Sequence, residues 1–228
     1  EFGPLDWRHP ATHSLYWAAM GVQISNERLH NEGVDVINTY RMTIHSLQEL
    51  VYSGRVSFDA VTPRGPRIDL APDPRFIPAY ERAYLAAREG IEEGRIRAGT
   101  ETSFKTGYEN LLRTAVLLTY LYGDMAQAEM YFKKLQEQYK GETRTDRPGY
   151  YTQTIEEMVV QMMGENLDLD SHARQFIDAM FRNAFRQGVA RDQPVVFQRF
   201  LDLAQHFYDE YHRDKLGTPN APQGRLRM

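Results

Sequence analysis

The 228-residue sequence contains no cysteine. Disulfide bonds, thiolate metal sites, iron–sulfur clusters and cysteine nucleophiles are therefore excluded together. Long apolar runs are also missing, because the longest uninterrupted aliphatic stretches, such as residues 115–118, fall far short of the roughly 18–20 residues that cross a bilayer. The sequence therefore predicts a soluble domain with no transmembrane segment.

Neither sign of charge dominates, since 31 Asp and Glu face 27 Lys and Arg, for a net charge of −4. A slightly acidic chain does not bind nucleic acid through bulk positive potential, so no nucleic-acid partner is expected. A hydrophobic fraction of 42% indicates a folded protein. We expect one helical-repeat domain over residues 1–215, followed by a Pro- and Gly-containing tail at 216–228.

The sequence motifs of common enzymes are missing. We find no Walker loop, no GxGxxG after a strand, no GxSxG and no HExxH. Paired carboxylates such as Glu92-Glu93 and Glu156-Glu157 fall on expected helix surfaces, where solvated charge is the simpler interpretation. We therefore expect no catalytic residue, no cofactor and no bound metal.

Apolar residues recur with helical spacing along most of the chain. The pattern predicts helices near residues 13–28, 34–52, 76–93, 111–122, 128–139, 155–163, 173–185 and 196–211. The last two are expected to form a helical hairpin, because Asp192-Gln193-Pro194 between them supplies a candidate N-cap and a first-turn proline. Residues 55–70 differ, because two short alternating runs flank a Pro/Gly turn, which predicts a β-hairpin or ordered loop.

Residues 108–140 resemble a tetratricopeptide repeat, a two-helix unit of about 34 residues. Ala115 occupies the small position of the first helix, and Gly123 stands at the turn. Ala128 occupies the small position of the second helix, with Phe132 and Leu135 at the following apolar positions. The Trp and the Leu-Gly pair of the first helix are missing, and no Pro closes the repeat. Residues 173–211 are a weaker copy, with Asp192 at the turn.

The predicted fold is therefore all-α: stacked antiparallel helical hairpins, similar to a tetratricopeptide solenoid or bundle, with one β-hairpin or loop near residues 55–70. Each hairpin carries an apolar face that stacking buries, and the stack leaves a concave surface. Proteins of this kind bind peptides or other subunits. The resemblance implies a non-catalytic scaffold with a protein or peptide partner. The alternatives are a structural subunit of a larger assembly, or a ligand- or metal-binding enzyme.

Tyrosines are the candidate partner-binding residues, because tyrosine gives contact area at low entropy cost. Packing between repeats explains the same residues equally well. The candidates cluster across one expected hairpin and its exit: Tyr120, Tyr122, Tyr131, Tyr139 and Tyr151.

A speculative ligand cleft lies near the N-terminus, where both tryptophans and two histidines gather: Trp7, Arg8, His9, His13 and Trp17. His9 and His13 have the spacing of two ligands on one helix face. However, Pro10 moves His9 out of the helical conformation, so the spacing does not predict a metal site. For the tryptophans, the favoured interpretation is that Trp7 is anchored in the core and Trp17 packs on the 34–52 helix.

The sequence begins at Glu1 without an initiator Met. We expect that a signal, membrane anchor, further domain or tag has been removed upstream. Export, membrane tethering and a cytoplasmic location are all compatible with the composition.

Overall fold

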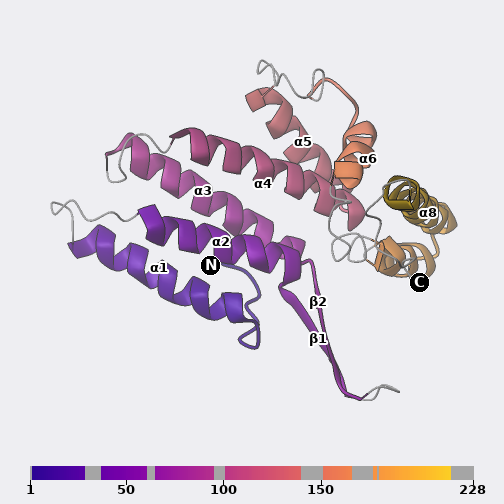
Figure 1. The fold of residues 1–228 in the computed structure, drawn as a ribbon, viewed down its shortest axis with the longest axis horizontal. Helices are drawn as coiled ribbons and strands as arrows, with labels where there is room; N and C mark the ends of the chain where they lie inside the picture. The colour runs from indigo at the N-terminus through magenta and orange to yellow at the C-terminus, as the bar shows by residue number, and fades with distance from the viewer. Residues whose placement is uncertain are drawn as a thin grey trace. The chain divides into compact units, whose positions relative to one another are not determined.

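The computed structural model describes residues 2–28, 37–60, 65–94, 101–139, 151–165, 177–178 and 180–216. Its elements are α1 (Pro10–Arg28), α2 (Ile37–Ser53), β1 (Arg55–Asp59), β2 (Arg67–Ala71), the 3₁₀-helix η1 (Pro74–Phe76), α3 (Ile77–Glu92), α4 (Glu101–Leu121), α5 (Met125–Tyr139), α6 (Ile155–Glu165), the π-helix η3 (Ala184–Val189) and α8 (Pro194–Leu216) (Figure 1). The predicted all-α fold of helical hairpins with one β-hairpin is confirmed.

The chain divides into two compact units, residues 1–111 and 112–228, with the boundary inside α4. Each unit is described by itself. The prediction of one domain over residues 1–215 stays a prediction. The described part of α8 reaches Leu216, and residues 217–228 of the expected tail lie outside the described residues.

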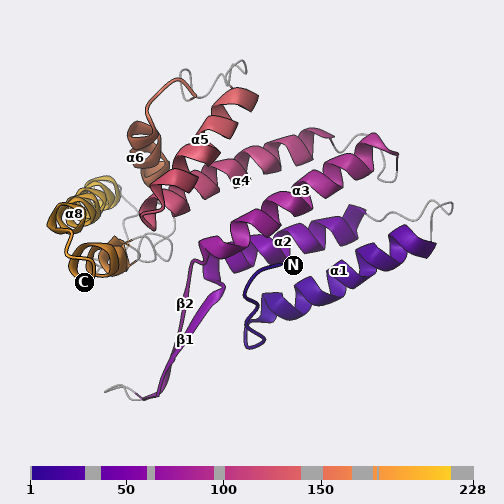
Figure 2. The same ribbon diagram turned by 180° about the vertical axis from the view of Figure 1, so that it is seen from behind.

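The first unit is built around α2, which packs against α1 and against α3 (Figures 1 and 2). Leu15 of α1 and Leu47 and Leu50 of α2 are fully buried between these helices. Aromatic rings of α3 and α4 extend this core. The Tyr84 ring packs edge-on against Phe104 and at a tilt against Tyr108. The Tyr108 hydroxyl donates a 2.9 Å hydrogen bond to the buried Glu81 carboxyl group.

The predicted β-hairpin is present, with β1 and β2 antiparallel and Phe58 paired with Ile68. The ribbon extends away from α1 and α2 (Figure 1). Because side chains alternate along a strand, Val56, Phe58, Ile68 and Leu70 share one face. Phe58, Ile68 and Leu70 are exposed, so the hairpin presents an apolar face.

In the second unit, α4 and α5 form a helical hairpin. Gly123 ends α4 with a positive φ of 76°, and the Asp124 carboxylate caps α5 by accepting from the Gln127 backbone N–H at 3.1 Å. The small residues Ala115 and Ala128 are fully buried, while Phe132 is half-buried; the resemblance to a tetratricopeptide repeat stays a prediction.

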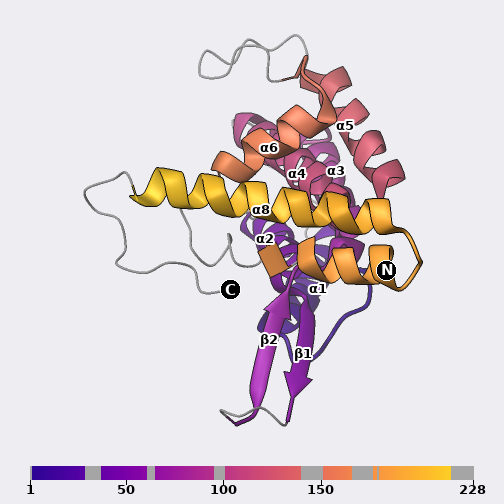
Figure 3. The ribbon, with the colours of Figure 1, turned by 90° about the vertical axis from the view of Figure 1, so that its right-hand side faces the viewer.

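The second helical hairpin of this unit joins η3 to α8 (Figure 3). Pro194 begins α8 as predicted, but Asp192 is not its N-cap. Asp192 has a φ of 52° and donates its N–H to the Val189 carbonyl, so it closes the preceding helix. Phe185 was predicted on the buried face, but it is 58% exposed, because the π-helical turn shifts the register of the apolar stripe. Its ring contacts the ring of Phe197 in α8. Ala173 and Phe176 lie outside the described residues.

Among the helices described, none combines the length and the hydrophobicity needed to cross a membrane.

Candidate functional site

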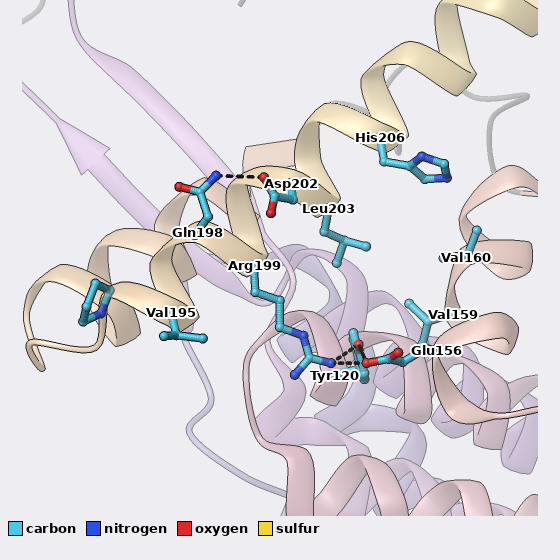
Figure 4. A pocket seen from close by; sticks show the side chains of 11 residues that line it. Tyr120, Glu156, Val159, Val160, Val195, Gln198, Arg199, Asp202, Leu203 and His206 are labelled. Atoms are coloured by element: carbon cyan, nitrogen blue, oxygen red, sulfur yellow. Dashed lines mark hydrogen bonds and ion pairs between the residues drawn. The ribbon is translucent and has the colours of Figure 1, made fainter.

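A groove of about 860 Å³ lies in the second unit, where α6 and α8 pack together. Its walls are apolar side chains from both helices, and its polar members come from α4, α6 and α8 (Figure 4). The lining residues are Tyr120, Glu156, Val159, Val160, Pro194, Val195, Gln198, Arg199, Asp202, Leu203 and His206.

One guanidinium organises the polar side of this groove. Nη2 of Arg199 donates a 2.7 Å hydrogen bond to Glu156 Oε1 and a second, short bond to the Tyr120 hydroxyl. The Tyr120 hydroxyl in turn donates to Glu156 Oε1 at 3.2 Å. The guanidinium carbon of Arg199 also lies 5.1 Å from the centre of the Tyr120 ring, within cation–π range. Figure 4 shows the three side chains converging from separate helices.

Hydrogen bonds at helix ends hold the helices that carry these residues. Thr154 and Glu157 form a capping box at the start of α6, in which the Glu157 carboxylate accepts from the Thr154 N–H at 2.8 Å. The Thr154 N–H and the Thr154 hydroxyl, which donates to the same carboxylate at 2.9 Å, together lower the pKa of Glu157. The buried Asn183 side chain donates to the Leu121 carbonyl, which supports the end of α4 next to Tyr120.

The charges of the site remain partly in contact with water. The side chain of Arg199 is 45% exposed and that of Glu156 is 67% exposed, so this ion pair contributes little stability. Burial raises the pKa of Tyr120, with Arg199 acting in the opposite direction, so the phenol stays protonated near neutral pH. Tyr120 therefore remains a hydrogen-bond donor to Glu156.

The polar side of the groove can recognise a carboxylate, because a guanidinium forms paired hydrogen bonds with carboxylate oxygens. Both described bonds of Arg199 leave from Nη2, so its Nη1 and Nε donors can meet a ligand carboxylate. The Gln198 amide is held by Asp202, to which it donates at 2.8 Å.

Of the five predicted partner-binding tyrosines, only Tyr120 lines the groove. Tyr131, Tyr139 and Tyr151 are buried, and the rings of Tyr139 and Tyr151 lie 5.9 Å apart. Tyr122 is half-buried at the end of α4. Tyr120 is also buried, at 5% exposed, so packing accounts for four of the five tyrosines, and among them only Tyr120 also lines the groove.

The predicted N-terminal cluster is divided between interior and surface. His9 is buried at the start of α1, where its Nδ1 accepts from the Ala11 N–H at 3.1 Å. A neutral His9 therefore carries its proton on Nε2, which points at Ser53 Oγ 3.0 Å away. The Ser53 hydroxyl donates to Glu49. Because His9 donates to Ser53, it cannot act as the base that takes the Ser53 proton.

The two histidines do not converge on a common point. His13 Nε2 donates to the Trp7 carbonyl at 2.8 Å, whereas His9 faces the interior. Arg8 pairs with Asp6 at 2.5 Å, and this pairing lowers the pKa of Asp6 to about 2. Within the described ranges, no group of three or more His, Asp or Glu side chains could hold a metal ion.

The favoured interpretation of the tryptophans is wrong. Trp7 is 53% exposed and Trp17 is 67% exposed, and Tyr16 contacts both rings edge-on. The reason is geometric: α1 buries the stripe of Ala11, Leu15 and Ala18, and residue 17 lies about 100° around the helix from residue 18. The indole of Trp17 therefore cannot reach α2.

Arg199 and Glu156 are the site residues that sequence reasoning missed. Glu156 was assigned to solvated surface charge, and its partner Arg199 lies 43 residues away along the chain. One weak signal was present, since Gln198-Arg199 interrupts the apolar run between Phe197 and Phe200 in α8.

Comparisons with known proteins identify no relative: no family model, no curated protein and no solved structure matches the chain.

Proposed function

We propose that this chain is a non-catalytic interaction domain that binds a peptide segment of another protein in the groove between α6 and α8. The observation that carries the proposal is the combination of apolar walls with one accessible guanidinium in a space of about 860 Å³. Arginine and tyrosine are the residue types most often found at the energetic centre of protein interfaces.

The chemistry of the groove defines the peptide. Val160, Val195 and Leu203 favour an aliphatic or aromatic side chain. Arg199 favours a carboxylate, either an Asp or Glu side chain or a C-terminal carboxyl group. The proposed ligand is therefore a short peptide in which an apolar residue lies next to a negative charge.

Selection from a random peptide library on the purified protein tests this proposal. We expect selected peptides to combine apolar and acidic residues, and Arg199→Gln to weaken their binding about tenfold, which corresponds to about 1.4 kcal/mol. Affinity is measured by fluorescence polarisation. Leu203→Asp should also abolish binding, because it places a charge in the apolar wall.

Arg88→Gln is the matched control, since Arg88 also pairs with a carboxylate, Glu92 at 2.9 Å, but lies on α3. Its peptide affinity should equal that of the wild type. Binding that is indifferent to Arg199→Gln and Leu203→Asp would show that the peptides bind elsewhere, and the proposed function would be wrong.

The exposed hairpin favours a second candidate, a structural subunit that buries this ribbon against another chain. A two-stranded ribbon is only marginally stable alone, and its apolar face is exposed. We expect Phe58→Thr with Ile68→Thr to change the free energy of unfolding by less than about 0.5 kcal/mol, because neither side chain packs in its own core. Urea denaturation measures this. A large loss of stability would instead mean that the face is covered within the chain.

A further inference from the structure

The helix α1 is apolar on two opposite sides. Its inner stripe faces α2, while an outer seam runs along the other side: His13, Trp17, Met20, Ile24 and Glu27. No Asp, Glu, Lys or Arg occurs between Arg8 and Glu27. A helix that is apolar all round normally lies between two layers, yet α1 forms the outer edge of the helices of its unit (Figure 2). Among the described residues of this unit, no second helix therefore packs along the outer seam.

The outer seam has the spacing of a helix–helix interface. Its members are separated by four, three, four and three residues, which is the repeat that packs one helix along another. Trp17 forms a ridge, being 67% exposed. Beside it, a groove of about 620 Å³ is lined by Phe2, Leu5, Leu15, Tyr16, Ala19, Met20, Val22, Gln23 and Glu27. A ridge next to a groove on the same helix is the self-complementary surface that a two-fold interface requires.

We propose that the outer seam binds a second copy of this chain, with the two α1 helices antiparallel about a two-fold axis at Met20. Charge favours the antiparallel arrangement over a parallel one, because a parallel pair would bring the two Glu27 carboxylates together, whereas the antiparallel pair separates them and places each opposite His13 of the other copy. A membrane surface is disfavoured as the occupant, because interfacial helices carry a Lys- and Arg-rich polar face that α1 lacks.

The exposed apolar area near the seam is large. Trp7, Tyr16, Trp17, Met20 and Ile24 are all partly exposed, and together they present on the order of 500 Å², since a large aromatic side chain offers roughly 150–250 Å². That is more than half of the about 800 Å² that each partner buries in a standard interface. Trp, Tyr and Met are also the residue types enriched in interface cores, from which charge is depleted.

Cysteine cross-linking tests the geometry, and the cysteine-free chain allows each introduced thiol to be interpreted alone. Met20→Cys should form a disulfide-linked dimer under mild oxidation, because the two-fold axis brings residue 20 against its own copy. Met130→Cys on α5 is the matched control, since Met20 and Met130 are similarly exposed, at 37% and 42%. The control should cross-link at least tenfold more slowly. Equal rates for the two variants would overturn the proposal.

Sedimentation equilibrium tests the energetics on the full chain. Trp17→Ala should raise the dimer dissociation constant at least tenfold. His13→Glu should also weaken the dimer, and adding Glu27→Lys to that variant should restore it, which identifies the antiparallel pairing. A wild-type chain that remains monomeric, or a dimer that is indifferent to all three variants, would refute the inference. None of these residues lies in the α6–α8 groove, so failure here leaves the peptide proposal intact.

Discussion

Replacing Tyr131 by alanine is expected to lower the free energy of unfolding of the second unit by about 3–5 kcal/mol, the cost of removing a large buried aromatic ring. Tyr131 is 2% exposed in the middle of α5, where the Lys134 ammonium lies 5.3 Å from the centre of its ring. The substitution leaves a cavity beside the α4–α5 hairpin that the rigid helices cannot fill. Urea denaturation followed by far-UV circular dichroism measures the loss.

The conservative variant Tyr131→Phe separates packing from recognition. It keeps the ring and removes only the hydroxyl, so a loss below about 1.5 kcal/mol is expected. Both variants should bind selected peptides normally at temperatures where they remain folded. A stable Tyr131→Ala that loses peptide binding would show that Tyr131 acts in recognition, and the structural role assigned to the buried tyrosines would be wrong.

The fold could be predicted largely because its signals are local. Gly123 and Asp124 mark the turn between α4 and α5, and Pro194 marks the start of α8. The alternating residues of 55–70 identified the hairpin without any tertiary information. Local capping and periodicity act over a few residues, so a single sequence displays them directly.

The candidate site could not be predicted in the same way. Tyr120, Glu156 and Arg199 lie on three helices, and only tertiary packing brings them together. In the sequence, Glu156 looks like any exposed helix carboxylate. The π-helical turn of η3 could not be predicted either, because a regular apolar spacing does not reveal where one turn widens. The exposure of Trp17 in α1 and of Trp7 before it was mispredicted, because hydrophobicity alone does not say which of two apolar faces packs against a neighbour.

Replacing Gly188 by alanine is expected to cost about 3 kcal/mol, at the upper end of overpacking effects. A Cβ atom at this position would lie 2.4 Å from Cβ, 2.6 Å from Cα and 2.7 Å from the backbone nitrogen of Phe197. These atoms belong to the first turn of α8, so no flexible side-chain tip can move aside. The added methyl group must push η3 away from α8.

This displacement should also affect the groove, because Arg199 follows Phe197 by two residues in α8. We therefore expect Gly188→Ala to lower both the urea midpoint and the affinity for selected peptides. Gly21→Ala is the control: its nearest atom is the side-chain Cγ2 of Thr39 at 3.0 Å, and alanine has the higher helix propensity, so little net change is expected. A Gly188→Ala variant as stable as the wild type would contradict the close packing of η3 against Phe197. The predicted loss of peptide affinity, which depends on that packing, would then have no basis.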